Sequence, residues 1–461
     1  MEIFRRRTYT LTLAVRSTKQ DGAKMEKSIP TDLIVEIVSR LPAKSAARCR
    51  CMSKLWRTIL RRQDFTDLFL TRSKARPRLL LAVQQLQDGE WSFYSTPQPQ
   101  NPSEKSSLVV SAADFHIKFS KGTSDCNCSY ASGLIYFHNM CIPREDEEDL
   151  KRVICNPLTG QYVILPELRG PSYSYLGFDP IDKEFKVLFM NNPEYIASSG
   201  TDHYILTLGT GELRWRKIRC PFTHEPFWER ICIDGVLYYS AHIDYYDGRR
   251  SNVIVCFDVR SETFKFVGVE SRFDQLINYK GKLGGIKLVC ESIFGPVELR
   301  MRVLEDVEKQ EWSKYDYTLS AGSDFRNVEE YLSVHGVTAT GDIVLLMNSA
   351  SALAPFNVFY FNPERKTFQS VEIQGVGVDC DCKLQAFVDY VEDLSINDAM
   401  LLKSSTLELG LCCHTSPGLS KSSQSVKKEQ IKYGLSSANL LYHSVGLAIF
   451  FVLCSLFFVF F

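Results

Sequence analysis

The sequence has no excess of charge of either sign, because its 461 residues include 54 basic and 54 acidic side chains. A protein that binds nucleic acid needs a positive field to hold phosphate, and the chain as a whole lacks one. The signatures of common enzymes are also missing. The chain contains no Gly-x-Ser-x-Gly elbow, no His-Glu-x-x-His, no phosphate loop ending in Gly-Lys-Ser/Thr and no dinucleotide fingerprint. We therefore expect no catalytic residues and no cofactor.

Cysteines spaced for a metal site are lacking as well. Zinc ligands are typically separated by two or more residues, whereas the close cysteine pairs here have one residue or none between them (Cys49/Cys51, Cys126/Cys128, Cys380/Cys382 and Cys412/Cys413). The 15 cysteines are scattered and odd in number, which favours free thiols in a reducing cytosol or nucleus. The glycine-rich stretch at Gly281 has no helix or hydroxyl for a phosphate and predicts a hairpin turn. The sequence thus predicts no metal site.

Long apolar runs are absent except near the carboxyl end. Residues 445–461 form an uncharged run, VGLAIFFVLCSLFFVFF. At ~1.5 Å per residue, a helix of this length reaches the short limit for crossing a bilayer, and residues 440–444 extend it. We expect a hydrophobic helix at 437–461 that anchors the protein in a membrane and leaves the rest of the chain on the cytosolic side. A flexible, Ser-rich linker at 395–436 precedes it. The alternatives are a buried strand and an artefact of the gene structure. At the other end, residues 1–26 are an extension that is either like a transit peptide or dispensable.

The stretch from residue 28 to residue 60 predicts three short helices. Apolar residues at positions 33, 34, 37 and 41 have the spacing of one helical face, and Pro42 ends that helix. Residues 43–50 give a second helix, Ser53 can cap a third, and 64–72 predict a closing helix. Three helices this short bury too little apolar area to be stable alone. We therefore expect some of their apolar side chains to contact another molecule.

These residues carry a resemblance to a known family. The motifs IPTDLIVEIVSRLP, KS and RCRCMSKLWR resemble an F-box, the adaptor-binding module of SCF-type ubiquitin ligases, and we place it at residues 27–72. The resemblance implies binding to a Skp-family adaptor and through it to the cullin scaffold. The residues that it places on or behind the adaptor face are Pro30, Leu33, Ile34, Ile37, Leu41, Pro42, Met52 and Trp56. Some of them, above all Trp56, are alternatively internal core. Other interpretations are a helical bundle with its own core and a helix-turn-helix DNA-binding domain.

Residues 78–394 predict an all-β domain with an internal repeat. Short apolar runs alternate with Asn-Pro, Asp-Gly and Thr-Gly turns. One unit, an apolar pair followed by a polar turn and an aromatic residue, recurs every 48 to 56 residues, with its aromatic at Tyr162, Trp215, Phe264, Trp312 and Phe368. A glycine-led apolar run precedes three of the copies, at Gly133, Gly235 and Gly341. This period is typical of kelch-like propeller blades.

A propeller with five visible units needs a further blade to close. Pairing residues 79–83 or 91–94 with 384–390 would complete a ring of about six blades and leave no exposed sheet edge. The alternative is a two-sheet β-sandwich. The fold class that we predict is therefore multi-domain: a small all-α F-box, an all-β propeller-like domain, and a hydrophobic carboxyl-terminal helix.

The β region also resembles a family. The motifs ICNPLTGQY, LGFDPIDKEFKVL, IDGVLYY and IVCFDVRSETF resemble the plant F-box-associated domain of the third type, which is taken to receive the target protein. The resemblance implies a non-catalytic substrate-recognition subunit that recruits a target for ubiquitylation by raising its concentration near the conjugating enzyme. Two alternatives remain: a membrane-attached interaction scaffold outside the ligase, and an enzyme built on a kelch-like propeller.

Overall fold

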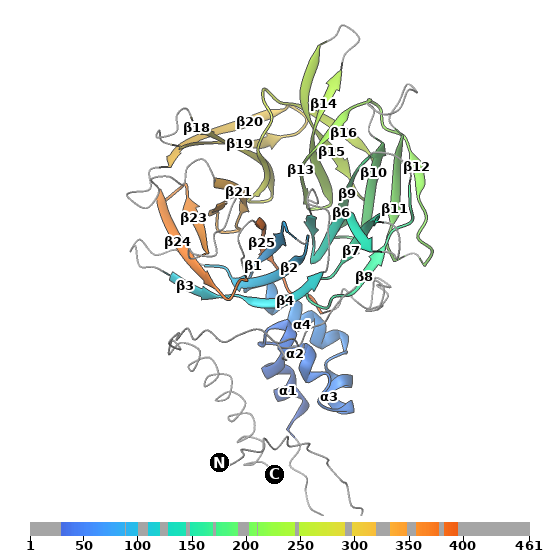
Figure 1. Cartoon of the computed structure of the whole chain (residues 1–461), viewed down its shortest axis with the longest axis vertical. Coiled ribbons are helices and arrows are strands. Elements are labelled where there is room, and N and C mark those ends of the chain that lie inside the picture. The colour runs from blue at the N-terminus through green and yellow to red at the C-terminus, as the bar shows by residue number, and fades with distance from the viewer. Residues whose placement is uncertain are drawn as a thin grey trace, which may run out of the picture. The chain divides into compact units, whose positions relative to one another are not determined.

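A computed structural model describes residues 29–87, 89–99, 109–119, 128–143, 148–168, 172–191, 202–209, 211–244, 249–290, 297–319, 332–347, 356–377 and 382–394 (Figure 1). The amino-terminal extension, the linker and the hydrophobic tail expected from the sequence lie outside these residues. None of the described helices is long and apolar enough to span a membrane. The described chain begins with four short helices and continues in strands to its end.

The helices are α1 (Thr31–Val38), α2 (Ala43–Cys49), α3 (Lys54–Ile59) and α4 (Gln63–Lys74). The predicted cap of the third helix is confirmed, because the Ser53 hydroxyl accepts a hydrogen bond of 3.1 Å from the amide of Trp56. The first helix differs from the prediction and ends at Val38, so that Leu41 lies outside it.

The apolar residues of α1 also differ from the single apolar face predicted from the sequence. Residues four apart share a helix face, and α1 has two such apolar pairs side by side. Ile34 and Val38 are buried, whereas Leu33 and Ile37 are exposed by 51% and 43%. The helix thus uses one pair as core and leaves the other in contact with solvent.

The strands form six sheets in the described residues, and we number the corresponding blades in chain order. Blade 1 contains β5 (Cys128–Ala131), β6 (Leu134–Pro143), β7 (Glu148–Cys155) and β8 (Tyr162–Ile164). Blade 2 contains β9 (Ser172–Asp179), β10 (Glu184–Asn191), β11 (His203–Thr207) and β12 (Arg216–Ile218). Blade 3 contains β13 (Glu225–Ile233), β14 (Val236–Asp244), β15 (Arg250–Asp258) and β16 (Phe264–Gly268).

The remaining blades follow the same plan. Blade 4 contains β17 (Gln275–Tyr279), β18 (Lys282–Cys290), β19 (Val297–Asp306) and β20 (Glu311–Leu319). Blade 5 contains β21 (Leu332–Val337), β22 (Ile343–Met347), β23 (Asn357–Asn362), β24 (Thr367–Gln374) and β3 (Val109–Ala112). The closing blade contains β25 (Cys382–Tyr390), β1 (Arg78–Gln85), β2 (Trp91–Pro97) and β4 (Asp114–Phe119). A six-bladed β-propeller is therefore shown, and the β-sandwich alternative is wrong.

The sequence repeat marks the same hairpin in blades 1, 3, 4 and 5. In the hairpin between the third and fourth strands, the side-chain oxygen of an Asn or Asp accepts a backbone amide hydrogen bond two or three residues later, at Asn156, Asp258, Asp306 and Asn362. The residue four positions after each of these has a positive φ. The repeated aromatic follows two residues later and is the first or second residue of the fourth strand. The period of about 50 residues is therefore the period of a side-chain-capped turn.

A second recurring turn joins the two innermost strands of a blade. Ser132-Gly133, Asp234-Gly235 and Lys280-Gly281 all have positive φ at both positions, as a two-residue type I′ hairpin requires. Glycine relieves the steric strain at the second position. The predicted hairpin turn at Gly281 is confirmed.

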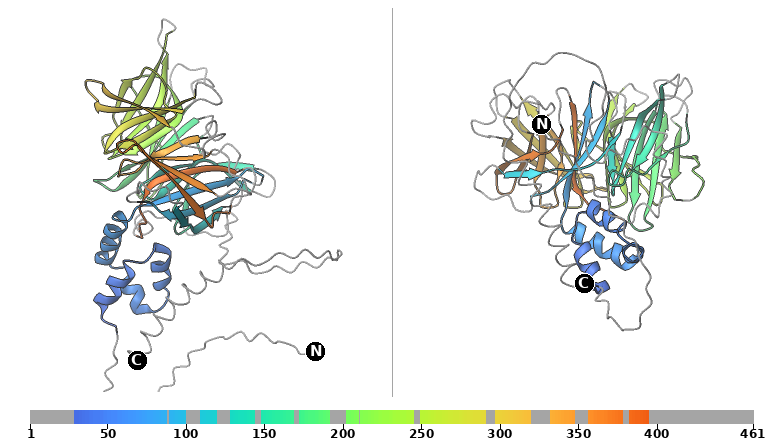
Figure 2. Two further views of the ribbon diagram at one scale, coloured as in Figure 1. Left: turned by 90° about the vertical axis from the view of Figure 1, so that its left-hand side faces the viewer. Right: turned by 60° about the horizontal axis from the view of Figure 1, so that its bottom comes forward.

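The ring closes by pairing the two ends of the β domain, as predicted. β1 lies between β2 and β25, with Leu81 opposite Ala386 and Val83 opposite Leu384. Figures 1 and 2 show the orange strand from the end of the domain beside the blue strands from its beginning. A second join was not predicted: β3 adds to the outer edge of blade 5 in parallel, with Val109 opposite Val371. Among the described residues, six apolar clusters lie at the junctions between neighbouring blades, one at each junction.

Candidate functional site

The helical segment exposes large apolar side chains that a closed core would bury. Besides Leu33 and Ile37, the side chains of Met52 and Leu55 are exposed by 63% and 56%. The same segment has a buried core of its own, which includes Ile59, Leu60, Phe65 and Phe69. The apolar side chains of this segment are therefore divided into a buried set and an exposed set, and exposed apolar patches are typical of interaction sites.

The eight residues that the F-box resemblance singled out divide by exposure. Pro30, Leu33, Ile37, Pro42 and Met52 are exposed, Leu41 and Trp56 are half-buried, and Ile34 is buried. The exposed side chains are accessible to a partner, whereas the side chain of Ile34 is buried and belongs to the core. Leu55 was missed, although its position directly before Trp56 in an amphipathic helix could have indicated it.

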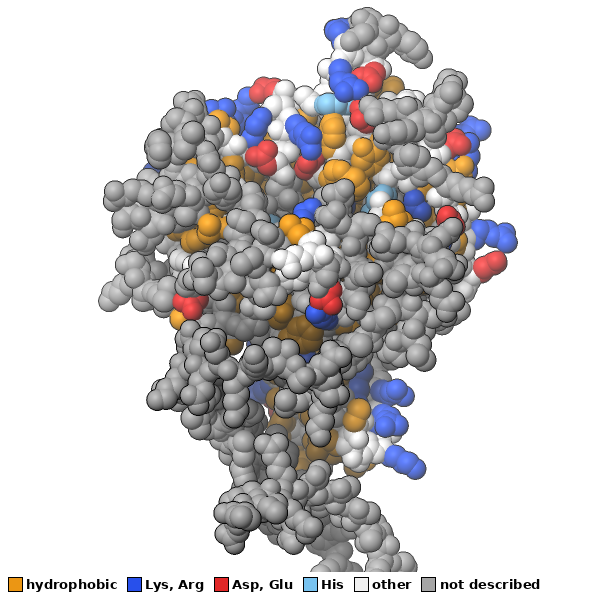
Figure 3. Space-filling model, in the orientation of Figure 1, with side chains coloured by type: hydrophobic (Ala, Val, Ile, Leu, Met, Phe, Trp, Pro, Cys, Tyr) orange, Lys and Arg blue, Asp and Glu red, His pale blue; other side chains and the backbone are white. Residues whose placement is uncertain are grey.

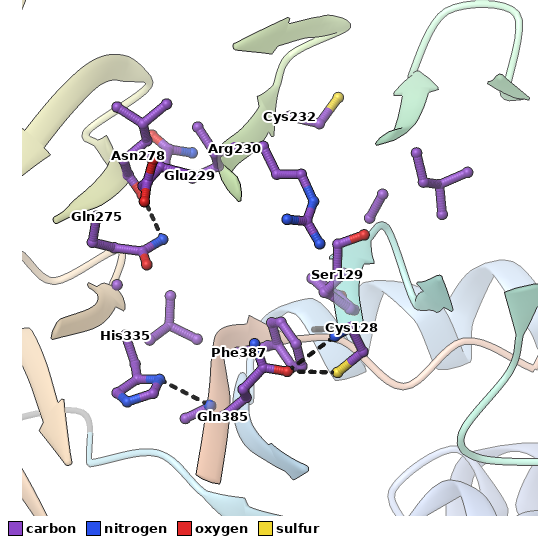
Figure 4. A pocket seen from close by; sticks show the side chains of 18 of the residues that line it. Cys128, Ser129, Glu229, Arg230, Cys232, Gln275, Asn278, His335, Gln385 and Phe387 are labelled. Atoms are coloured by element: carbon purple, nitrogen blue, oxygen red, sulfur yellow. Dashed lines mark hydrogen bonds between the residues drawn. The ribbon is translucent and has the colours of Figure 1, made fainter. Parts of the chain in front are cut away.

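The second candidate site is a cavity of about 320 Å³ at the centre of the propeller (Figure 4). Its walls come from the innermost strand of every blade, β5, β9, β13, β17, β21 and β25. Polar side chains lie around it, among them Ser129, Arg230, Gln275, Asn278 and Gln385. None of these residues was predicted, because a channel lining combines single residues from strands far apart in the sequence.

His335 lines the cavity but already uses both ring nitrogens. The amide of Ala386 donates to Nδ1 over 3.1 Å, so that Nδ1 is unprotonated, and Nε2 lies 2.8 Å from the Ser333 hydroxyl. Burial lowers the pKa of His335 to about 4. The imidazole is therefore neutral at physiological pH and is occupied as a structural group rather than free as a base.

Arg230 points its guanidinium into the cavity (Figure 4). Its Nη1 donates to the Trp228 carbonyl over 2.6 Å, and the guanidinium carbon lies 5.4 Å from the centre of the Tyr175 ring. No carboxylate of the described residues forms an ion pair with Arg230, and its buried Nε atom has no hydrogen-bond partner there. Burial lowers its pKa, but an arginine stays charged in proteins. The cavity thus has a positive group in its wall.

The carboxylates at the cavity are already engaged. Glu229 pairs with Arg272, with 2.5 Å between Oε1 and Nη2, and Asp389 accepts a hydrogen bond of 2.8 Å from the Gln98 amide. The Cys128 thiol donates to the Gln385 side-chain oxygen over 2.9 Å. Among the described lining residues, no nucleophile therefore lies beside a base that could activate it. The polar lining is suited to binding.

The propeller rim carries charges of both signs rather than a single-sign patch. On the face seen in Figure 3, acidic and basic side chains are interspersed. Many of them join neighbouring blades or strands as exposed ion pairs, such as Lys314–Glu270 and Arg260–Asp182. Such pairs contribute little stability individually.

One cluster in the described part of the chain has the chemistry of a metal site. His203, Cys220 and His224 each place one potential ligand atom within 4.8 Å of the other two. The close cysteine pairs considered from the sequence do not belong to it. The cluster joins two segments that are separated in the chain, so its histidine from β11 could not be found by spacing alone.

Comparison with known proteins identifies two family domains. Residues 27–68 match the F-box domain, and residues 78–391 match the F-box associated beta propeller domain. The chain is 58% identical over 440 residues to F-box only protein 12 of Arabidopsis thaliana, covering 94% of this chain and 98% of that protein. It is 62% identical over 386 residues to a putative F-box protein of the same plant, covering 82% of this chain and 97% of the relative.

Among solved structures, the chain is similar at a low level to a mutant of Synechocystis apocarotenoid oxygenase. The TM-score is 0.34 at 11% identity, over 65% of this chain and 78% of that chain. A subtype N11 neuraminidase-like protein gives a TM-score of 0.30 at 10% identity, over 66% and 78% of the two chains.

Proposed function

Because the chain belongs to the F-box proteins that carry an F-box-associated β-propeller domain, we propose that it is the substrate-recognition subunit of an SCF-type ubiquitin ligase. Its helical segment binds a Skp-family adaptor, and through the adaptor the cullin scaffold. Its propeller recruits a target protein. The chain itself contributes position rather than catalysis, since it holds the target close to the conjugating enzyme.

The observation that carries the proposal is the pair of exposed apolar side chains on α1, Leu33 and Ile37, beside a pair that is buried. An isolated helical module gains nothing from exposing leucine and isoleucine at successive turns. Burying side chains of this size against a partner contributes roughly 1.5–3 kcal/mol each. This exposed stripe therefore supports an adaptor interface better than a self-contained bundle.

The decisive experiment is co-purification of the full chain with a Skp-family adaptor. Replacing Leu33 by Ala and Ile37 by Asp removes two anchors, and the expected loss of affinity is roughly a hundredfold or more. Ile181, an equally apolar side chain that is 68% exposed on the propeller, supplies the matched control as Ile181→Asp. Equal adaptor binding by both variants would contradict the proposal and favour a scaffold outside the ligase.

The proposed place of the target is the propeller face around the central cavity. Trp228 is 39% exposed and lines the cavity with Arg230, and Trp and Arg are the residue types that most often dominate protein interfaces. The engaged carboxylates and histidine support binding over an enzyme on the same fold. We further propose that the complex works in the cytosol or nucleus, with residues 437–461 as a membrane anchor.

A further inference from the structure

The strongest unassigned cluster lies where the chain passes from blade 2 to blade 3. His203 is the first residue of β11, and Cys220 and His224 lie on the connection between β12 and β13. The two imidazoles are 1% and 2% exposed, their ring centres are 5.2 Å apart, and Cys220 is half-buried. Two blades of the core thus bring a thiol and two imidazoles together at one point.

The distance between two of the three ligand atoms fits a tetrahedral metal ion. Cys220 Sγ lies 3.8 Å from His224 Nδ1. Zinc–sulfur and zinc–nitrogen bonds of about 2.3 Å and 2.1 Å at a tetrahedral angle place these two atoms about 3.6 Å apart. Thiolate and imidazole ligands select zinc over magnesium or calcium, which prefer oxygen. For this pair of ligand atoms the geometry needs a displacement of only a few tenths of an ångström, and all three ligand atoms of the cluster lie within 4.8 Å of one another.

The second nitrogen of His224 has the partner that a metal ligand needs. Nε2 lies 2.9 Å from the hydroxyl of Tyr239, which is fully buried on β14 of blade 3. With Nδ1 bound to an ion, Nε2 carries the ring proton and donates it to the tyrosine oxygen. Such outer hydrogen bonds fix the orientation and tautomer of ligating histidines.

Without an ion, two donors of the cluster compete for one acceptor. The Cys220 thiol and Nδ1–H of His224 lie 3.2 Å and 3.0 Å from the carbonyl oxygen of Phe222. Binding of a cation by the sulfur releases the thiol proton to solvent and removes this competition.

We propose that His203, Cys220 and His224 bind one Zn²⁺ ion, with a water molecule in the fourth position. The half-exposed thiol leaves that position open to solvent. The ion fixes the connection between β12 and β13 to strand β11 of blade 2. Tyr239 of blade 3 supports the ligand His224. Its role is structural, and the proposal is independent of the adaptor and target assignments.

The test measures zinc in the purified full chain after dialysis against micromolar Zn²⁺. We expect stoichiometric zinc that is lost in Cys220→Ser and falls several-fold in His203→Gln and His224→Gln. Cys232→Ser is the matched control, because this half-buried thiol instead contacts the backbone of Phe178, and it should retain the ion. Substituting Co²⁺ should produce the absorption of a thiolate-bound tetrahedral ion in the wild type but not in Cys220→Ser.

A stability measurement separates an ion site from a hydrogen-bond network. A chelator should lower the melting temperature of the wild type by several degrees and leave that of Cys220→Ser unchanged. Equal zinc contents in the wild type and Cys220→Ser, or a melting temperature of the wild type that is indifferent to chelator, would overturn the proposal. Either result would assign the three residues to hydrogen bonding around the Phe222 carbonyl.

Discussion

The carboxylate of Glu392 accepts a hydrogen bond of 2.9 Å from the backbone amide of Ala43, the first residue of α2, across 349 residues of chain. Pro42 at the amino-terminal cap of α2 provides no side-chain acceptor, so an acidic residue beyond the last propeller strand takes that role. A negative charge is also favourable at a helix amino terminus. Glu392 is 6% exposed, and the contact therefore links the helices to the propeller inside the protein.

Replacing Glu392 by Ala should lower the free energy of unfolding by roughly 1–2 kcal/mol, because a buried amide loses its acceptor. Glu392→Gln keeps an acceptor oxygen and should have a smaller effect. Chemical denaturation of the two variants measures the difference. Equal destabilisation by Ala and Gln would mean that the negative charge, rather than the hydrogen bond, holds this contact.

The contact between Glu392 and the Ala43 amide also predicts that the free energy of unfolding depends on pH. Burial raises the pKa of Glu392 above its usual value, so between the unfolded and folded pKa values the folded chain binds more protons than the unfolded chain. The contribution of Glu392 to stability is then largest below the unfolded pKa and falls as the pH rises through the folded pKa. Glu392→Gln should remove this dependence. A stability–pH curve for Glu392→Gln that matches the wild type would contradict it.

Two buried histidines predict a pH dependence of stability that is opposite to that of Glu392. Burial lowers the pKa values of His116 and His138 to about 3, so both are neutral in the folded chain. Nearby cations act in the same direction: Arg78 and Lys44 for His116, and Arg152 and Arg230 for His138. The folded pKa lies below the unfolded value, so the stability that each contributes is lost as the pH falls from about 6.5 towards 3.

Each histidine should add about 1.4 kcal/mol per pH unit to the slope of stability against pH in this range. His138 is also hydrogen-bonded to Ser174 and stacks edge-on against Trp228, neither of which is charged. Urea unfolding at successive pH values should show a shallower slope for His138→Gln than for the wild type. An unchanged slope would mean that His138 titrates in the folded protein.

Ring closure predicts that a substitution in β1 weakens the whole propeller. Leu81 is 1% exposed and packs at the junction of the closing blade with blade 5. Leu81→Ala should cost about 2–5 kcal/mol, and unfolding should remain a single transition by fluorescence and circular dichroism. Leu150→Ala, at a leucine that is 47% exposed on β7, should change stability by less than about 0.5 kcal/mol. If Leu81→Ala were as stable as Leu150→Ala, ring closure through β1 would not contribute to the stability of the propeller.

The hydrophobic tail supplies a prediction that rests on sequence alone. Leu, Ile, Phe and Val each favour membrane insertion by roughly 0.3–0.6 kcal/mol at a helix centre, while one Arg opposes it by about 2.5–3.5 kcal/mol. Replacing Leu453 and Phe457 by Arg should therefore release the protein from membranes in alkaline carbonate extraction, with adaptor binding intact. Equal extraction of the unmodified protein would remove the tail as an anchor.

The sequence predicted features that repeat and missed features that occur once. The turn at Asp258 could be recognised because Asn156, Asp306 and Asn362 impose the same local geometry on their own hairpins. Closure by β1 and β25 followed from the need to pair both edges. The parallel strand β3, by contrast, has no local signature, because its register depends on an edge formed more than 250 residues later.

The adaptor face and the cavity show the same division. Apolar spacing indicated Leu33 and Ile37, but spacing alone gives no reason why Ile34, one residue further on, is buried. Side chains that line the cavity come singly from six strands, and no pattern along the chain connects Arg230 with Ser129. Such sites become visible only when the blades are placed around a common axis.

Two arginines give opposite predictions, one that lines the cavity and one that pairs with the lining residue Glu229. Arg272 pairs with Glu229, whose side chain is 13% exposed, so Arg272→Gln leaves a buried carboxylate without its partner and should lower the melting temperature by several degrees. Arg230 has no carboxylate partner among the described residues, and its positive charge is held in the cavity wall at a cost in desolvation. Arg230→Gln should therefore leave the melting temperature unchanged or raise it, as expected for a residue kept for binding rather than stability. Thermal unfolding of both variants in complex with the adaptor distinguishes the two roles, and a drop for Arg230→Gln as large as that for Arg272→Gln would make Arg230 a structural residue.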